Sequence, residues 1–309
     1  QDLSNGAFQR CSTLQMVALK SILTVEICVF DGCSQLYELD LPKCQTICNN
    51  SFQGCSLQIL NLVNLTAISQ NAFENCSNLI SVDLPFCESI GPSAFVNCSL
   101  LQKVISKNLK TLGSQAFVNC ENLTLLDLPQ CETIKQSCFR NCSSLQTLHL
   151  NNVITIECEA FCGCIGLTAI DLPKCENIHA EAFRNCSSLQ QISLENVKII
   201  GANAFDNCEQ LTFVDMPNCE TIGDQSFYNC SSLLLLDLNR VKMIQKYAFA
   251  QCSKLASANL PQCEIIELGA FKNCSTMQTI NFVNIKKIAP YTFENCNSLS
   301  KIDLPFQKT

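Results

Sequence analysis

Cysteine offers this chain most of its chemistry, because 25 cysteines but only two histidines occur among 309 residues. Thiols can pair in disulfides, bind zinc as thiolates or act as nucleophiles. The densest group by spacing consists of Cys138, Cys142, Cys158, Cys162 and Cys164. Cys162 stands two residues before Cys164 and would point away from it in a regular turn. The sequence therefore favours structural or surface thiols over a zinc site, and we predict no bound metal.

Most of the cysteines recur at fixed positions. A Phe-x-x-Cys pair repeats every 22 residues, with a single interval of 21, at Cys11, Cys33, Cys55, Cys76, Cys98, Cys120, Cys142, Cys164, Cys186, Cys208, Cys230, Cys252, Cys274 and Cys296. Alternate repeats carry a second cysteine eleven residues later, at Cys44, Cys87, Cys131, Cys175, Cys219 and Cys263. Cysteines stacked in register lie nearly a strand spacing apart, whereas a disulfide needs Cβ atoms about 3.8 Å apart. We predict buried thiols that pack as small hydrophobic side chains.

Other catalytic groups are scarce. His149 and His179 are isolated, no glycine-rich phosphate loop occurs, and the recurring Ser-Ser after Asn-Cys belongs to the repeat. We therefore predict no catalytic residue, no cofactor and no enzymatic activity. A net charge of -7 without a basic cluster argues against a nucleic-acid partner. No apolar run is long enough to span a membrane.

The 22-residue period predicts a stacked solenoid. After each anchoring cysteine the chain reads Leu-x-x-(Leu/Ile/Val)-x-Leu, as in Leu145, Leu148 and Leu150, which is typical of a short half-buried strand. The remaining Ile-Gly-x-x-Ala-Phe-x-Asn-Cys part predicts one or two helical turns. We expect an α/β solenoid: one right-handed domain over residues 1–309, with 14 units, one parallel concave sheet and short helical turns on the convex side.

These motifs resemble a known family. Leu-x-x-Leu-x-Leu is similar to the leucine-rich repeats, and the Ala-Phe-x-x-Cys-x-x-Leu half resembles the BspA-like class found on surface proteins of bacteria and anaerobic protists. That resemblance implies protein recognition or adhesion at the cell surface, or secretion. The cysteine at every second repeat is closer to the cysteine-containing repeats of F-box proteins. It leaves open a cytoplasmic location and a role as an intracellular adaptor.

Two charged columns indicate that the true period is two repeats. Twelve residues after the anchor, glutamates alternate with lysines, at Glu88, Glu132, Glu176, Glu220 and Glu264 and at Lys110, Lys198, Lys242 and Lys286. Seven residues after the anchor, aspartates alternate with other residues, except that Asp237 follows Asp215 directly. In a stack, alternation avoids like charges on neighbouring units. We expect the glutamates and lysines to form ion pairs and the aspartates to lie on a solvated face. Both columns should fix the register in which the repeats stack.

The residues on the solvent side of the strands form the candidate binding surface, because solenoids bind ligands along their concave sheet. We select Tyr37, Asp40, Asp83, Asp127, His149, Asp171, Phe213, Asp215, Leu234, Leu235 and Asp237, and Asp303 continues the aspartate series. Phe213, Leu234 and Leu235 form its most apolar patch, which indicates a contact with a protein ligand.

Two further questions stay open from the sequence. The chain begins in mid-repeat and ends just after Leu304, so we expect an array uncapped at both ends, which could stack head to tail into filaments. Nine Asn-x-Ser/Thr sequons occur, six of them as the Asn-Cys-Ser of the repeat. They predict either glycans along one edge or asparagines that hold a turn.

Overall fold

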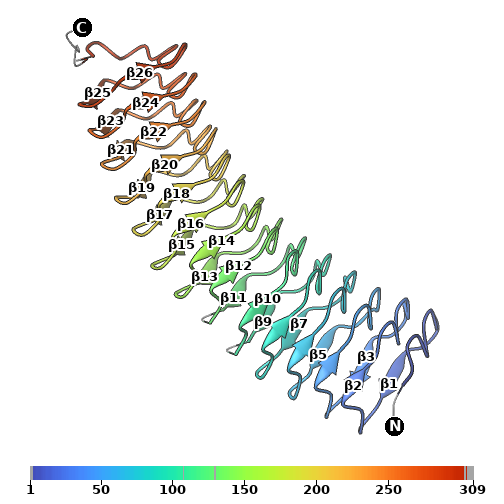
Figure 1. The fold of residues 1–309 in the computed structure, drawn as a ribbon. Helices are drawn as coiled ribbons and strands as arrows, with labels where there is room; N and C mark the ends of the chain where they lie inside the picture. Colours follow the sequence, from blue (N-terminus) through green and yellow to red (C-terminus); the bar gives the residue numbers. More distant parts are fainter. Residues whose placement is uncertain (1–2, 107, 129, 303, 305–309) are drawn as a thin grey trace. The chain divides into compact units, whose positions relative to one another are not determined.

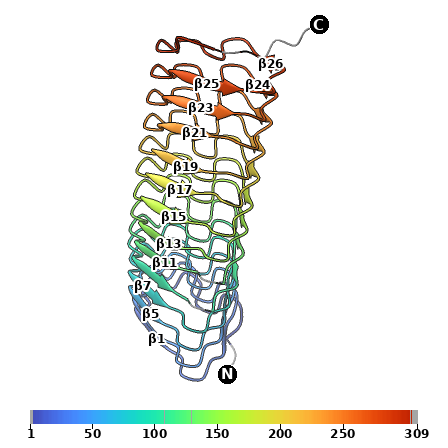
Figure 2. The same ribbon diagram turned by 90° about the vertical axis from the view of Figure 1, so that its left-hand side faces the viewer.

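The computed structural model describes residues 3–106, 108–128, 130–302 and 304, and of Asn61, Leu125, Leu126, Asp127, Thr147 and His149 it describes the backbone alone. The chain forms two compact units, residues 1–150 and 151–309. Each unit is a parallel-strand solenoid in which successive coils stack on one another (Figure 1). Every complete coil contributes two short strands, one to each of two sets of strands that we call the first sheet and the second sheet (Figure 2).

In unit 1 the first sheet follows the Leu-x-Leu pattern and the second sheet the Thr-Ile pattern later in each coil. The first-sheet strands are β1 (Met16–Ala18), β3 (Glu38–Asp40), β5 (Ile59–Asn61), β7 (Ser81–Asp83), β9 (Lys103–Ile105), β11 (Leu125–Asp127) and β13 (Thr147–His149). The second-sheet strands are β2 (Thr24–Val25), β4 (Thr46–Ile47), β6 (Ala67–Ile68), β8 (Ser89–Ile90), β10 (Thr111–Leu112) and β12 (Thr133–Ile134).

Unit 2 repeats this plan. Its first-sheet strands are β15 (Ala169–Asp171), β17 (Gln191–Ser193), β19 (Phe213–Asp215), β21 (Leu235–Asp237), β23 (Ser257–Leu260) and β25 (Thr279–Phe282). Its second-sheet strands are β14 (Thr155–Ile156), β16 (Asn177–Ile178), β18 (Ile199–Ile200), β20 (Thr221–Ile222), β22 (Met243–Ile244), β24 (Ile265–Ile266) and β26 (Lys287–Ile288).

The strands pair in parallel with a register of one repeat. In unit 2, for example, Ile192 of β17 lies opposite Val214 of β19. The side chains alternate, so that the middle residue of a first-sheet strand is less exposed than its two neighbours, as Val214 is between the exposed Phe213 and Asp215. This confirms the expected half-buried strand. The second sheet was not predicted, because two residues are too few to show a period in the sequence.

The expected helical turns are wrong: none of the described residues forms a helix. In the part of each coil that leads to the anchoring cysteine, where helical turns were expected, every second backbone N–H donates its hydrogen bond to the next coil. It does not donate to a carbonyl of its own coil. The N–H groups of Asn203, Phe205 and Asn207 donate to the carbonyls of Asp224, Ser226 and Tyr228. Residues 203 and 207 also have positive φ, at 54° and 60°. Left-handed residues four apart interrupt any right-handed helix, so the segment forms tight turns that stack by backbone hydrogen bonds.

A continuous column of phenylalanine rings fills the core of each unit. The rings stack with centroids 5.3 Å apart for Phe73 and Phe95, and 5.1 Å apart for Phe205 and Phe227. Such offset-stacked rings are a favourable arrangement of aromatic side chains. The leucine three residues after the anchoring cysteine is buried beside them, as Leu101 and Leu211 are. Most coils thus add one ring, one leucine and one thiol to the core.

Candidate functional site

Most of the cysteines are buried thiols, as predicted. None of the cysteines is in a disulfide. The thiol of an anchoring cysteine donates a hydrogen bond to the carbonyl of the phenylalanine 25 residues earlier, as Cys98 Sγ does to Phe73 O (3.2 Å) and Cys208 Sγ to Phe183 O (3.2 Å). Burial raises the pKa of Cys208 well above its usual value, so the thiol stays protonated. Among the described residues, no group of three or more His, Cys, Asp or Glu side chains is placed to hold a metal ion.

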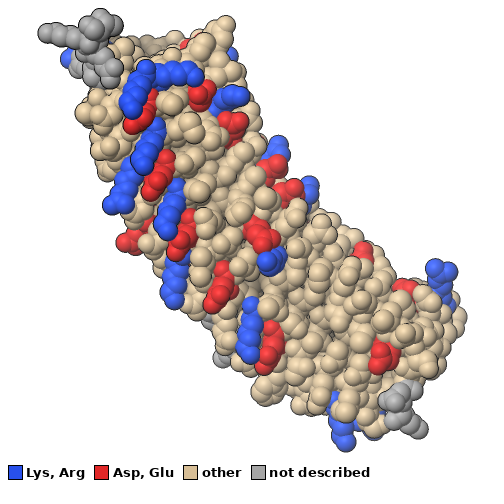
Figure 3. Space-filling view, viewed as in Figure 1, with Lys and Arg blue, Asp and Glu red and all other residues tan. Residues whose placement is uncertain are grey.

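The second-sheet side carries the expected ion-pair column. Lys110 Nζ lies 2.9 Å from Glu88 Oε2 in unit 1. In unit 2, Lys198 pairs with Glu176 (2.8 Å) and Lys286 with Glu264 (2.7 Å), while Lys242 and Glu220 lie 3.9 Å apart. Basic and acidic groups alternate along this side of unit 2 (Figure 3). The pairs are solvent-exposed and therefore contribute little stability each. We expect their main effect to be on register, because a slip of one coil would bring like charges together.

The predicted binding residues lie on the outer face of the first sheet. Tyr37, Asp40 and Asp83 in unit 1 and Asp171, Phe213, Asp215, Leu234, Leu235 and Asp237 in unit 2 are exposed. Asp127 and His149 occupy β11 and β13, but their side chains lie outside what is described, as does Asp303 entirely. No helix in the described part of the chain is long and apolar enough to cross a membrane.

Four of these residues come together around one hollow of about 340 Å³ in unit 2, lined by Phe213, Asp215, Leu235 and Asp237 together with Val214, Pro217, Leu236, Asn239 and Ser257. Phe213 is 53% and Leu235 54% exposed, on the neighbouring strands β19 and β21. Leu234, 47% exposed, precedes β21 beside this hollow but does not line it. We call this feature the first-sheet hollow. The other candidate residues do not line it.

The first-sheet hollow lies where the sheet is interrupted. β19 and β21 are not hydrogen-bonded neighbours, although β17 pairs with β19 and β21 with β23. Asp215 and Asp237 occupy the same position of these two strands, and like charges directly opposite each other destabilise a strand pair. On the other side, Asn259 Nδ2 donates to Asp237 Oδ1 at 3.0 Å. The two consecutive carboxylates give the hollow an acidic rim, whereas a like interruption between β3 and β5 occurs without such a pair.

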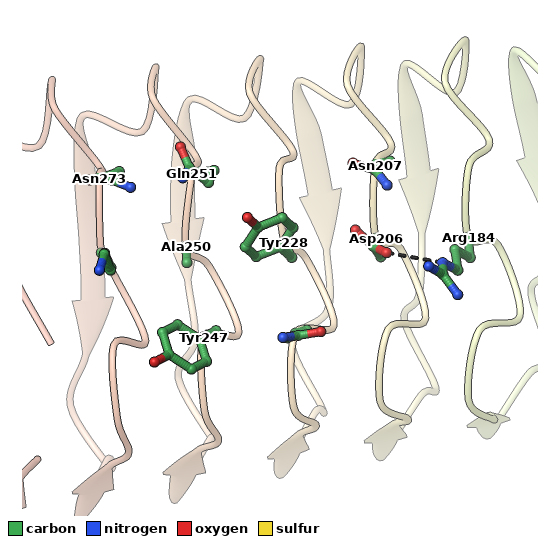
Figure 4. A pocket seen from close by; sticks show the side chains of 10 residues that line it. Arg184, Asp206, Asn207, Tyr228, Tyr247, Ala250, Gln251 and Asn273 are labelled. Atoms are coloured by element: carbon green, nitrogen blue, oxygen red, sulfur yellow. Dashed lines mark hydrogen bonds and ion pairs between the residues drawn. The ribbon is translucent and has the colours of Figure 1, made fainter. Parts of the chain in front are cut away.

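A second hollow, of about 580 Å³, lies on the turns of unit 2 and was not predicted from the sequence (Figure 4). We call it the turn-face hollow. It is lined by Arg184, Asp206, Asn207, Gln225, Tyr228, Tyr247, Ala250, Gln251, Lys272 and Asn273. Ala250 takes the place that Tyr228 and Lys272 occupy on the adjacent coils, which leaves the space open. In the sequence, the signal was Tyr228 and Tyr247, at positions where most other repeats carry small or polar residues, and the repeat pattern masked it.

The charges at the turn-face hollow are already paired. Arg184 Nε donates to Asp206 Oδ2 at 3.1 Å, and its Nη1 to Glu181 Oε2 at 2.9 Å. Lys272 Nζ lies 2.8 Å from Glu294 Oε2. Asp206 is 6% exposed, and its buried Oδ1 has no hydrogen-bond partner among the residues that the structure describes. Burial raises the pKa of Asp206, and the Arg184 guanidinium opposes this rise without cancelling it.

The turns are ordered by a ladder of asparagine side chains. Asn207 Nδ2 donates to Asn185 Oδ1 at 3.1 Å, and Asn229 Nδ2 to Asn207 Oδ1 at 2.9 Å. These residues have φ near 60°, a conformation in which asparagine is favoured. The Asn-Cys-Ser motif therefore holds the turn, as one of the two interpretations proposed. At Gln251 the ladder is interrupted, because no side-chain hydrogen bond of Gln251 occurs among the described residues.

Tyr247 adopts an unfavourable backbone conformation at the turn-face hollow. Its φ is 53°, and a left-handed conformation costs a residue with a Cβ about 1–2 kcal/mol. The ring packs against Gly269, where an added Cβ would overlap Tyr247 Cε1. Gly269 is therefore needed to accommodate the ring. The left-handed conformation itself belongs to the repeat, because Asn203 and Gln225 adopt it at the same position with φ of 54° and 53°.

The sequence matches the family described as "BspA type Leucine rich repeat region", in six copies over residues 1–124, 110–234 and 236–309. No curated protein matches the chain. A leucine-rich repeat protein from Bacteroides ovatus is similar in structure, with a TM-score of 0.71, 25% identity, and coverage of 90% of this chain and 81% of that one. A leucine rich cell surface protein from Faecalibacterium prausnitzii has a TM-score of 0.46 and 25% identity, with coverage of 78% and 71%.

Proposed function

This chain belongs to the BspA-type leucine-rich repeat family, and on that premise we propose that it binds a protein ligand at the cell surface through the first-sheet hollow of unit 2. Proteins of this fold are generally binding scaffolds without catalytic activity. Surface exposure or secretion and a role in adhesion are the further parts of the proposal. The family and the outer face of the first sheet support them.

The observation that carries the proposal is the exposed apolar pair Phe213 and Leu235. Their neighbours on this face in unit 2 are mostly polar, as Asp171, Ser193 and Asn281 are. Adjacent exposed apolar side chains beside a hollow are typical of contact sites. Aromatic and aliphatic anchors that fill a partner's surface supply most of the free energy of such contacts.

The acidic rim narrows the kind of ligand. Asp215 and Asp237 both line the hollow, and no basic side chain is among its lining residues. A ligand segment that pairs an apolar side chain with lysine or arginine would complement this arrangement, because opposite charges steer encounter and fix orientation. We therefore expect the ligand to be a protein with a basic, partly apolar segment, bound more weakly at high salt.

A peptide selection tests the site. A phage-displayed library of random dodecapeptides is selected on the intact protein, and enriched peptides are titrated against Phe213→Ser and Leu235→Ser. We expect basic peptides with aromatic or aliphatic residues, and an affinity at least roughly tenfold lower for either variant. Ile59→Ser is the matched control, since Ile59 is an apolar residue of β5 that is 58% exposed on the same sheet face. Peptides that bind the Phe213 and Leu235 variants as well as the wild type would refute the site.

Location needs a separate measurement. Antibodies against the folded protein are applied to intact and to permeabilised cells of the source organism. The proposal expects labelling of intact cells at a level close to that of permeabilised cells. Labelling that requires permeabilisation would move the function to the intracellular adaptor, the alternative that the second cysteine of alternate repeats suggests.

A further inference from the structure

The turn-face hollow differs from the first-sheet hollow in the chemistry of its walls. Its lining contains one aliphatic residue, Ala250, together with the amides of Asn207, Gln225, Gln251 and Asn273 and the rings of two tyrosines. The first-sheet hollow contains Val214, Leu235 and Leu236. Peptide side chains need apolar depressions to anchor in, and the turn-face hollow offers none beyond Ala250. The two hollows therefore suit different classes of ligand.

Charge does not select the ligand of the turn-face hollow. Arg184 is paired with Asp206 and Glu181, and Lys272 with Glu294. An anion would have to displace one of these partners, and the carboxylate oxygen that has no partner among the described residues, Asp206 Oδ1, is buried. A neutral molecule with many hydrogen-bonding groups needs no such exchange, and amide side chains supply both donors and acceptors for it.

The amide ladder ends at this hollow, which leaves amide groups available. Asn229 continues the ladder from Asn207, and Asn273 accepts from Asn295 Nδ2 at 2.7 Å. Between them Gln251 makes no side-chain hydrogen bond within the described residues, and the same holds for Asn273 Nδ2. Both residues line the hollow. A ligand with hydroxyl groups would complete the hydrogen bonding that the ladder leaves open.

The tyrosines supply flat surfaces beside these amides. Figure 4 shows the rings of Tyr228 and Tyr247 on adjacent coils, near Ala250. Both rings are half-buried, and Gly269 leaves the room that the Tyr247 ring needs. At the corresponding position other coils carry mostly smaller or polar residues, such as Asn203 and Gln225, although Tyr291 two coils later is also aromatic. An aromatic ring is therefore present at a position where the backbone disfavours it, and it borders an unfilled space.

From these observations we propose that the turn-face hollow is a carbohydrate site that binds a neutral sugar of one or two rings. A pyranose has an apolar C–H face that can lie on a tyrosine ring, and hydroxyls at its edge that can bond Gln251 and Asn273. The site is independent of the proposed protein-binding function, because it uses neither the first sheet nor Phe213 and Leu235. It gives the molecule a second contact, to glycans, on a different face of unit 2.

Saturation-transfer NMR with four separate sugars, maltose, cellobiose, lactose and N,N′-diacetylchitobiose, tests the inference. The intact protein should transfer saturation to the ring protons of at least one of them. Tyr247→Asn should weaken that binding at least roughly tenfold. This substitution installs the residue type that other coils carry at the same left-handed position, so a melting temperature equal to or above that of the wild type is expected. A weaker signal then reports the lost ring and not unfolding.

Tyr291→Asn is the matched control. Tyr291 stands at the same position two coils later, has a φ of 58° and is 65% exposed, but does not line the hollow. Its substitution should leave sugar binding unchanged. The proposal fails if none of the four sugars binds, or if Tyr247→Asn binds as tightly as the wild type. A third result would also overturn the carbohydrate proposal: no sugar binds, but dodecapeptides bind the wild type and Tyr247→Asn abolishes that peptide binding. The hollow would then be a peptide site.

Discussion

At the residue scale, the buried thiols are the most numerous chemical groups, and their environment makes them inert. Cys87 donates to Ser89 O at 3.3 Å, and the anchoring cysteines donate to the phenylalanine carbonyls of the preceding coil. A thiol is a weak donor that also packs like a small apolar side chain. The thiol therefore donates a hydrogen bond to a buried backbone carbonyl. A valine or leucine at the same position has no donor and would leave that carbonyl without this bond.

The raised thiol pKa values predict that the protein loses stability in alkali. Burial raises the pKa of Cys87, Cys131 and Cys263 to about 11, whereas an unfolded thiol has a pKa of about 8.5. Between these values the unfolded state binds fewer protons than the folded one. The contribution of each of these thiols to the free energy of unfolding is therefore fully present below about pH 8.5. It is lost as the pH rises towards 11, by up to about 1.4 kcal/mol per pH unit for each thiol.

Urea denaturation between pH 7.5 and 10.5 measures this dependence. A variant with Cys87→Ala, Cys131→Ala and Cys263→Ala will be less stable at every pH, but its free energy of unfolding should fall less steeply with pH. An identical slope in the two proteins would show that these thiols do not titrate differently on unfolding.

The asparagines before the anchoring cysteines combine a backbone role with a side-chain role. Asn119 has a φ of 59°, donates to Asn97 Oδ1 at 2.8 Å and accepts from Asn141 Nδ2 at 2.9 Å. Asn119→Ala loses both roles and should cost about 1–3 kcal/mol. Asn119→Gly keeps the left-handed backbone without strain and should cost less. Thermal melting of the two variants checks the order, and a glycine variant less stable than the alanine variant would contradict it.

At the element scale, the sequence shows what recurs with a visible period and hides what does not. Phe117, Cys120 and Leu123 are buried as their spacing predicts, and the ion pair of Lys110 with Glu88 forms as the alternation predicts. The turns were misjudged because Ala-Phe-x-Asn-Cys resembles a helical pattern, while the left-handed residues that prevent a helix are of many types, including Ser93, Gln115 and Tyr247.

The two hollows show the same limit of prediction from the sequence. Phe213 and Leu235 were predicted as an exposed patch, because they stand on strands whose alternation is readable. The interruption of the sheet between their strands was not predicted, although Asp237 broke the alternating pattern of aspartates. The turn-face hollow is formed by side chains from three positions of the turn, which meet only when successive coils stack. That geometry is set by the stacked turns, whose conformation the sequence did not indicate.

The phenylalanine column should be the element most sensitive to substitution. Phe117 is fully buried between Phe95 and Phe139, with centroids at 5.3 and 5.5 Å. Phe117→Ala should cost about 3–5 kcal/mol through lost burial and the cavity that remains. Phe8→Ala is the control, because Phe8 is 38% exposed. A denaturation midpoint that shifts equally for both variants would mean that the column does not hold the coils together.

At the scale of the whole molecule, the alternation of charge makes the pair of coils the true repeat. Within unit 2, removing residues 187–230 would place Lys242 on the coil next to Glu176 and preserve the alternation. Removing residues 187–208 would place Glu220 next to Glu176 instead. Both deletions keep the Phe, Cys and Leu columns in register. They therefore separate the effect of charge order from the effect of core packing.

We expect both shortened proteins to fold, with a difference in their response to salt. In the 22-residue deletion the adjacent glutamates repel each other, and added salt screens that repulsion. Raising NaCl from 0.05 to 1 M should therefore raise its melting temperature relative to that of the 44-residue deletion. Parallel responses to salt would show that the charged column does not influence the register.

The hydrogen-bonded thiols also set a requirement on the time course of folding. In the stacked coils, thiols such as Cys98 and Cys208 are enclosed and protonated, and so are poor partners for disulfide exchange. Before the coils stack, all 25 cysteines are accessible on one chain, and any two could be joined wrongly by an oxidant. If the protein is exported to oxidising surroundings, each coil must therefore close over its cysteine faster than disulfides form. The cysteine core protects the finished molecule but makes the nascent chain vulnerable.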